Sequence, residues 1–196
     1  MKHPLRAGLG VVCLLSTLTG CAPVVIGGAA ATGVLVAHDR RTAGTMVDDQ
    51  TIELKAHRLL SEDKELTKDT HINVTSYNLV ATLTGEVPNP QMKAKAGEIV
   101  KSIPRVRRVN NELGIAAPSS LMSRASDSVI TGKVKVALLK IDELPGFDPT
   151  RVKVVTERGT VYLMGLLTHK EAAAVINKSR QVDGVQRVVA LFEYID

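Results

Sequence analysis

The feature that most constrains the fold is an internal repeat. The second half of the chain restates the first at an offset of about 80 residues. A match at a fixed offset indicates that each copy is one structural unit. Two copies of about 70 residues are small for independent domains but lie within the range that folds alone. The matched segments are 49–52 with 127–130, 59–60 with 138–139, 72–75 with 152–155, 83–85 with 163–165, and 106–109 with 185–188.

Hydrophobic periodicity predicts the same elements in both copies. In the first copy, Asp49 can cap a helix whose apolar residues recur at helical spacing, namely Ile52, Ala56, Leu59 and Leu60. Two short segments of alternating apolar residues follow and are typical of a β-hairpin. A second helix and a last strand complete the copy.

Signals for turns and helix ends support this order. Asn89, followed by a proline, is expected to open the second helix of the first copy. Thr168 opens its counterpart, and Glu171 three residues later completes a capping box. The Glu-Arg-Gly sequence at 157–159 is a hairpin turn signal, and residues 188–194 alternate as a final strand.

These elements predict an α+β protein made of two tandem αββαβ domains. In each domain a three-stranded mixed sheet packs against two helices on one face, which is the economical way to bury both. The first domain is expected at 48–117 and the second at 118–196, with an Ala-Pro-Ser segment near 116–120 between them. The chain has no Trp, so both cores must be mainly aliphatic.

The first 20 residues have the order of a secretory signal peptide. Lys2 and Arg6 form a positively charged start, and an apolar run over about 9–18 follows. This run is too short for a membrane-spanning helix, which needs ~20 apolar residues. We therefore expect residues 1–20 to be a signal peptide, although a signal anchor remains an alternative.

The Leu-Thr-Gly-Cys sequence at 18–21 resembles the lipobox of bacterial lipoproteins. That resemblance implies that Cys21 is lipidated and begins the mature chain, with 21–47 as its lipidated N-terminus and flexible tether. Several acyl chains together give an effectively permanent membrane anchor. In such lipoproteins an aspartate after the cysteine commonly retains the protein at the inner membrane. Ala22 stands there instead, which implies sorting to the outer membrane, facing the periplasm.

Composition narrows the function classes further. Cys13 lies in the signal peptide and Cys21 would be lipidated, so no intramolecular disulfide is expected. Residues 1–20 hold two basic residues and no acidic one, so the rest carries 23 basic and 20 acidic residues, a net charge of +3. This charge permits weak attraction to anionic lipid. Two Phe and three Tyr are too few for a base-stacking surface, so no nucleic-acid partner is expected.

No pattern in the sequence predicts catalysis. The five histidines include no pair at i, i+4 with a glutamate between them, and no thiol remains to share a metal. Gly-x-Ser-x-Gly is absent, and no glycine-rich phosphate loop follows a strand. We therefore expect no enzyme activity, metal, cofactor or small-molecule substrate.

The repeated unit resembles the BON domain. The resemblance rests on the element order, on Gly85 at the end of the second strand, and on two phrases, Val-Arg-Arg-Val-Asn-Asn at 106–111 and Asp-Gly-Val-Gln-Arg-Val at 183–188. Two such domains behind a lipobox are similar to the dual-BON outer-membrane lipoproteins. The resemblance implies a non-enzymatic protein that binds anionic phospholipid, supports envelope integrity and gathers at division sites. Its partners would be the membrane and possible envelope or division proteins.

The candidate phospholipid-binding surface is the helix at 121–139. Its basic residues outnumber its one acid, Asp127, and it carries more apolar residues than one buried face needs. The apolar residues are Leu121, Met122, Val129, Ile130, Val134, Val136, Ala137, Leu138 and Leu139. Aliphatic side chains flanked by lysines can insert shallowly among head groups while the ammonium groups meet phosphates. The candidate residues are Val129, Ile130, Lys133, Lys135 and Lys140 on or beside the helix, and Leu144 and Phe147 in the loop after it.

Other interpretations of this surface stay open. Ile130, Val134, Leu138 and Leu139 can form a core face, with the lysines as a solvated rim, and Phe147 can cap the helix–sheet core. The resemblance also aligns an aromatic residue of the family with Val129, which lacks the amphipathic ring suited to a membrane interface. The alternative function is a periplasmic protein-interaction scaffold for envelope-assembly partners, without direct lipid binding.

Overall fold

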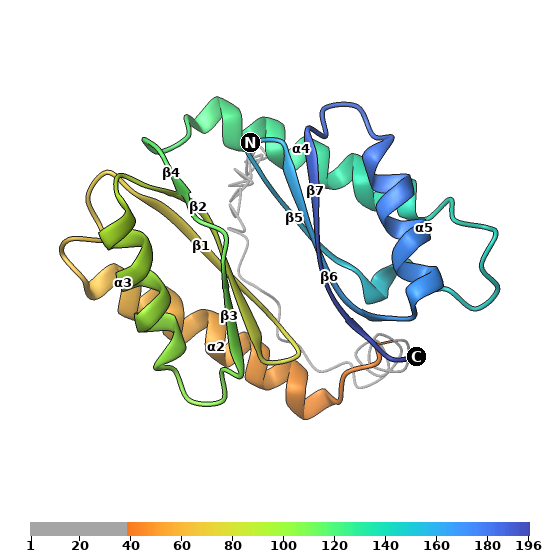
Figure 1. Cartoon of the computed structure of the whole chain (residues 1–196), viewed down its shortest axis with the longest axis horizontal. Helices are drawn as coiled ribbons and strands as arrows, with labels where there is room; N and C mark the ends of the chain where they lie inside the picture. The colour runs from red at the N-terminus through yellow and green to blue at the C-terminus, as the bar shows by residue number, and fades with distance from the viewer. Residues whose placement is uncertain (1–38) are drawn as a thin grey trace, which may run out of the picture.

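The computed structural model describes residues 39–196, and the signal peptide, Cys21 and most of the expected tether lie outside them. The predicted order of elements is confirmed in both units (Figure 1). The first contains α2 (Ala43–Glu62), β1 (His71–Tyr77), β2 (Val80–Val87), α3 (Pro90–Lys101), β3 (Arg108–Asn111) and the short β4 (Gly114–Ile115). The second contains α4 (Leu121–Leu138), the 3-10 turn η1 (Pro149–Arg151), β5 (Lys153–Glu157), β6 (Thr160–Leu167), α5 (His169–Arg180) and β7 (Arg187–Tyr194).

Each sheet is mixed, as predicted. The first two strands of each unit form an antiparallel hairpin, and the last strand lies parallel to the second strand on its other side. In the first unit this last strand is interrupted, since β3 and β4 both pair with β2 in one continuous register. Leu113, between them, is buried in the core of its unit. The expectation of three strands therefore holds, with the third strand of the first unit broken into two pieces.

The helices of each unit pack on one face of their sheet around an aliphatic core. Ile52, Ala56 and Leu60 point inward from α2. Their counterparts on α4, at a constant offset of 78, include Ile130 and Leu138. The expected match of residues 59–60 with 138–139 is therefore wrong by one position, because Leu60 rather than Leu59 shares the place of Leu138.

The prediction that Asp49 caps the first helix is wrong. The helix begins six residues earlier, and Thr42 is its N-cap. Asp49 is buried and accepts hydrogen bonds from the backbone N–H groups of Asn78 and Leu79, both at 2.8 Å. Asn78 and Leu79 form the turn between β1 and β2 and have positive φ. The repeated aspartate therefore ties a helix to a strained hairpin turn.

The other predicted helix starts are confirmed. The Asn89 side chain accepts from the Met92 N–H at the start of α3, and Thr168 and Glu171 form the capping box of α5. Because α2 begins at Ala43, the expected tether of residues 21–47 ends in folded structure.

The two sheets face each other, with the helices on the outside (Figure 1). The contact holds a small core of Tyr77, Tyr162 and Met164, which are buried between the sheets. Because β2 is covered on both faces, all of its residues are buried. Polar contacts lie around this core, including ion pairs of Lys153 with Glu53 and of Arg107 with Glu193, at 2.7 and 2.6 Å.

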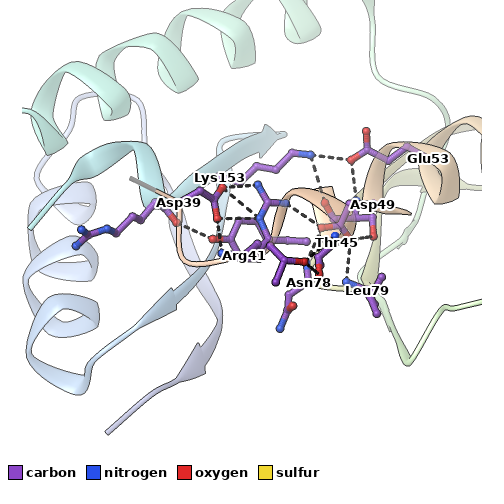
Figure 2. A network of polar contacts seen from close by, with 12 residues as sticks. Asp39, Arg41, Thr45, Asp49, Glu53, Asn78, Leu79 and Lys153 are labelled. Carbon is purple, nitrogen blue, oxygen red and sulfur yellow. Dashed lines mark hydrogen bonds and ion pairs between the residues drawn. The ribbon is translucent and has the colours of Figure 1, made fainter. Parts of the chain in front are cut away.

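A short segment at the start of the described chain joins both domains (Figure 2). The Arg41 guanidinium contacts the carboxylates of Asp39 and Asp49 at 2.7 and 2.9 Å and lies 4.0 Å above the Tyr77 ring. Arg40 extends to the second domain, where it forms an ion pair with Glu171 at 2.6 Å. We call residues 39–41 the strap.

Candidate functional site

The helix α4 has two apolar faces. Its inward face holds Ile130 and its neighbours in the core, as described above. On its outward face Met122, Val129 and Val136 are 80%, 59% and 53% exposed. These three residues recur every seven positions, close to two helical turns, so they lie in one line along the helix. Leu139, just beyond the helix, lies beside the end of this line and is exposed, so it does not belong to the core face. We call Met122, Val129, Val136 and Leu139 the outer stripe.

Lysines border the outer stripe, and α4 itself has no exposed acid, although Asp142 and Glu143 are exposed in the loop after it. Lys133, Lys135 and Lys140 are all exposed. The one acidic residue of the helix, Asp127, is buried and accepts hydrogen bonds from the Arg158 and Gly159 N–H groups at 2.9 and 2.8 Å. Its charge is therefore turned inward, away from the lysines. The outward face of α4 combines exposed aliphatic side chains with positive charge alone.

The structure corrects one predicted member of this surface. Ile130 is only 7% exposed and packs in the core of the second unit, near the Gly184 backbone. It lies on a different face of α4 from Val129, because one residue along a helix turns the side chain by about 100°. Ile130 is thus a core residue and is removed from the candidate site.

The loop residues Leu144 and Phe147 lie apart from the outer stripe. Both are half-buried and pack against the core of the second unit. They line a pocket of about 310 Å³ with Arg40 and the first turn of α5. The structure therefore does not bring them together with the lysines of α4.

The first domain has a different surface on its first helix, where Val47 and Leu54 are 64% and 70% exposed. Two basic and four acidic residues lie in α2, whereas α4 has three basic residues and one buried acid. At the offset of 78, Thr51 and Arg58 stand in the places of Val129 and Val136. The exposed aliphatic residues of α2 therefore lie in a helix with more acidic than basic residues, and the combination of apolar side chains with positive charge alone is particular to α4.

The described residues include one buried carboxyl with a raised pKa. Burial raises the pKa of Glu157, although the hydrogen bond from Asn73 and the nearby His71 oppose the shift. Such a group can mark an active site. Glu157 lies on β5, however, and its partners Asn73 and His71 lie on β1 of the other sheet. Its surroundings therefore belong to the contact between the two sheets. Within residues 39–196 no group of three His, Cys, Asp or Glu side chains is placed to hold a metal ion.

Some residues of the surface were missed by sequence reasoning. Met122, Val136 and Leu139 were recognised as apolar but were not assigned to the site. The signal that could have separated them from the core is the seven-residue spacing with Val129. Lys178, on α5, lies beside Lys133 and Lys140 only because the two helices pack together. In the part of the chain that the structure describes, no helix is long and apolar enough to cross a membrane.

Comparison with known proteins places this architecture in a family. The BON domain matches residues 48–117 and 126–196. The outer membrane lipoprotein DolP of Haemophilus influenzae is 35% identical over 179 residues, covering 91% of each chain. The 21 kDa hemolysin of Actinobacillus pleuropneumoniae is 33% identical over 80% of this chain and 79% of its own. Osmotically-inducible protein Y of Escherichia coli is 29% identical over 74% of this chain and 72% of its own. The chain therefore belongs to the BON-domain family and carries two BON domains.

Proposed function

We propose that this protein is an outer-membrane lipoprotein, anchored through Cys21 and facing the periplasm, whose second BON domain binds anionic phospholipid. The observation that carries the proposal is the outward face of α4, where exposed aliphatic side chains lie between lysines that pair with no acid among residues 39–196. Similarity to an outer membrane lipoprotein over nearly the whole chain supports the anchor. We assign the protein a binding role without catalysis.

The physical strength of this contact suits an anchored protein. Each lysine near an anionic surface contributes about 1 kcal/mol. A fully buried aliphatic side chain contributes about 1.5–3 kcal/mol, and shallow insertion only part of that. Val129 has no aromatic ring, so Met122 and Leu139 supply the larger apolar contact. The lipid anchor keeps α4 at high effective concentration near the membrane, so weak binding is sufficient.

The segment between Cys21 and the strap is long enough for α4 to reach the membrane. In Figure 1 the start of α2 and the body of α4 lie on opposite sides of the molecule. The 18 residues from Cys21 to Asp39 can span at most about 60 Å. That reach lets an anchored molecule turn α4 toward the leaflet that holds its acyl chains.

The family resemblance also leads us to propose a role in envelope integrity and enrichment at division sites.

Vesicle co-sedimentation of the unacylated chain from residue 22 onward tests the proposal. We expect binding to anionic vesicles that weakens with salt, and little binding to zwitterionic vesicles. Val129→Asp and Lys133→Glu should each weaken vesicle binding by about tenfold or more. Val129→Asp places a negative charge in the outer stripe, and Lys133→Glu replaces a positive charge beside the stripe with a negative one.

The repeat supplies matched controls for this experiment. Thr51→Asp and Lys55→Glu make the corresponding changes on α2 and should leave vesicle binding within about twofold, since the exposed aliphatic residues of α2 lie in a helix with four acidic residues, which anionic lipid repels. If the wild-type chain binds no vesicle, the lipid proposal is wrong and a protein-interaction scaffold is favoured. If the α2 variants lose as much affinity for anionic vesicles as the α4 variants do, the net charge of the protein rather than the surface of α4 determines binding.

A further inference from the structure

A groove of about 430 Å³ lies at the C-terminal ends of α4 and α5. Three lysines surround it, Lys133 and Lys140 from the α4 side and Lys178 from α5. Its remaining lining is Val136, Ala137, Gln181 and Val182, with no acidic residue among them. Within residues 39–196 no ion pair or side-chain hydrogen bond engages the three ammonium groups, so their charges are available to a ligand.

The first domain shows that the fold does not require this arrangement. At the offsets of the repeat, Glu62 stands where Lys140 does, and Ile99 stands where Lys178 does. Glu62 also pairs with Arg58 of its own helix at 3.8 Å. In the first domain the charges at the end of α2 pair with each other. In the second domain, which has the same fold, three lysines stand at the corresponding place without an acidic partner among residues 39–196.

Resting on the proposed function, we propose that this groove binds the phosphodiester head group of a single anionic phospholipid. The three ammonium groups surround the phosphate, and the lysine stems cover the apolar floor. Val136 belongs both to this floor and to the outer stripe, so the acyl chains continue from the groove along the stripe. The groove thereby supplies head-group recognition, and the stripe supplies insertion.

The position of the groove favours a phospholipid over a free phosphate ion. The C-terminal ends of both helices carry partial negative charge, which attracts the lysines and opposes a bare anion. A ligand that adds apolar contact with Val136 and Val182 offsets this opposition, whereas inorganic phosphate adds none.

Two double variants of the unacylated chain from residue 22 test the groove. Lys140→Gln with Lys178→Gln removes two groove charges, whereas Lys55→Gln with Lys101→Gln removes two exposed lysines of the first domain. At about 1 kcal/mol per lysine, the groove variant should bind anionic vesicles about thirtyfold more weakly. The control variant should stay within about threefold of the wild-type chain.

A second measurement uses NMR with dihexanoyl phosphatidylglycerol below its micelle concentration. We expect saturable shifts at the Ala137 and Val182 amides, absent in the groove variant and absent with inorganic phosphate or dihexanoyl phosphatidylcholine. If wild-type and groove variant bind vesicles equally, the groove assignment is overturned while the proposed function stands. Saturation by inorganic phosphate at similar concentrations would overturn the lipid assignment. Failure of the wild-type chain to bind any vesicle would overturn both proposals.

Discussion

At the residue scale, the two repeated aspartates show why a motif can be found and still be misinterpreted. Asp49 and Asp127 stand out in the sequence, and an aspartate before an apolar helix pattern normally indicates an N-cap. The structure places both aspartates inside their helices, where each carboxylate accepts hydrogen bonds from two backbone N–H groups of the hairpin turn. That role depends on a turn about 30 residues away, which no local pattern reveals.

Asp127→Ala should lower the free energy of unfolding of the second domain by about 3 kcal/mol. The substitution leaves the Arg158 and Gly159 N–H groups without their charged acceptor, and hydrogen bonds to charged groups contribute about 1.5–3 kcal/mol. Urea unfolding measures the change. Ser128→Ala, at the exposed neighbouring position, should change it by less than about 0.5 kcal/mol. Equal effects of the two substitutions would contradict this role.

Glu157 should make the junction between the domains more stable in mild acid than at neutral pH. Burial raises its folded-state pKa above the ordinary value of 4.5. A raised pKa gives stability that is fully present below the unfolded value and is lost as pH rises through the folded value. As the pH is lowered from 7 to 4.5, the melting temperature of the wild-type protein should therefore rise. The rise should be smaller in Glu157→Gln. Glu143→Gln, at an exposed position, should retain the wild-type profile, and a full rise in Glu157→Gln would refute the assignment.

At the element scale, most of the fold was predictable because its signals are local. The order of helices and strands and the caps at Asn89 and Thr168 follow from periodicity and capping chemistry. The two faces of α4 were harder to separate, since both are aliphatic and only packing decides which one is buried. Ile130 was therefore assigned to the surface, and Val136 was left out of it.

Two valines on α4 should separate stability from membrane binding. Val134 is fully buried, so Val134→Ala should lower the free energy of unfolding by about 2 kcal/mol through lost burial and a cavity. Val136 belongs to the outer stripe, so Val136→Ser should leave unfolding within about 0.5 kcal/mol but weaken vesicle binding severalfold. Chemical unfolding and co-sedimentation of both variants provide the check. Loss of stability in Val136→Ser would place that residue in the core instead.

At the scale of the whole molecule, the packing of the two sheets could not be foreseen from the sequence. The repeat predicts two domains but says nothing of the strap, whose arginines resemble any solvated pair. Burial and the Asp39 carboxylate act in opposite directions on the pKa of the Arg41 guanidinium, and the net shift is upward. The strap thus adds a buried charge network to the junction.

Arg41→Met should loosen the contact between the domains. It keeps an apolar stem over Tyr77 but leaves the buried Asp49 carboxylate without its charged partner. Breaking a buried ion pair on one side costs about 3–5 kcal/mol. We expect a lower melting temperature and NMR shifts at Tyr77 and Tyr162 in the junction core. Arg108→Met, at an exposed strand position, serves as the control. An unchanged melting temperature in Arg41→Met would show that the strap does not stabilise the junction.

The central claim is that the outward face of α4 contacts anionic membranes, and a fluorescent probe at position 129 tests it most directly. The chain from residue 22 onward contains no cysteine, so Val129→Cys accepts a single environment-sensitive label, and Thr51→Cys places the same label on α2. The account predicts a blue shift at position 129 with anionic vesicles, reversed by high salt, and none at position 51. An unchanged spectrum at position 129, or equal shifts at both positions, would contradict it.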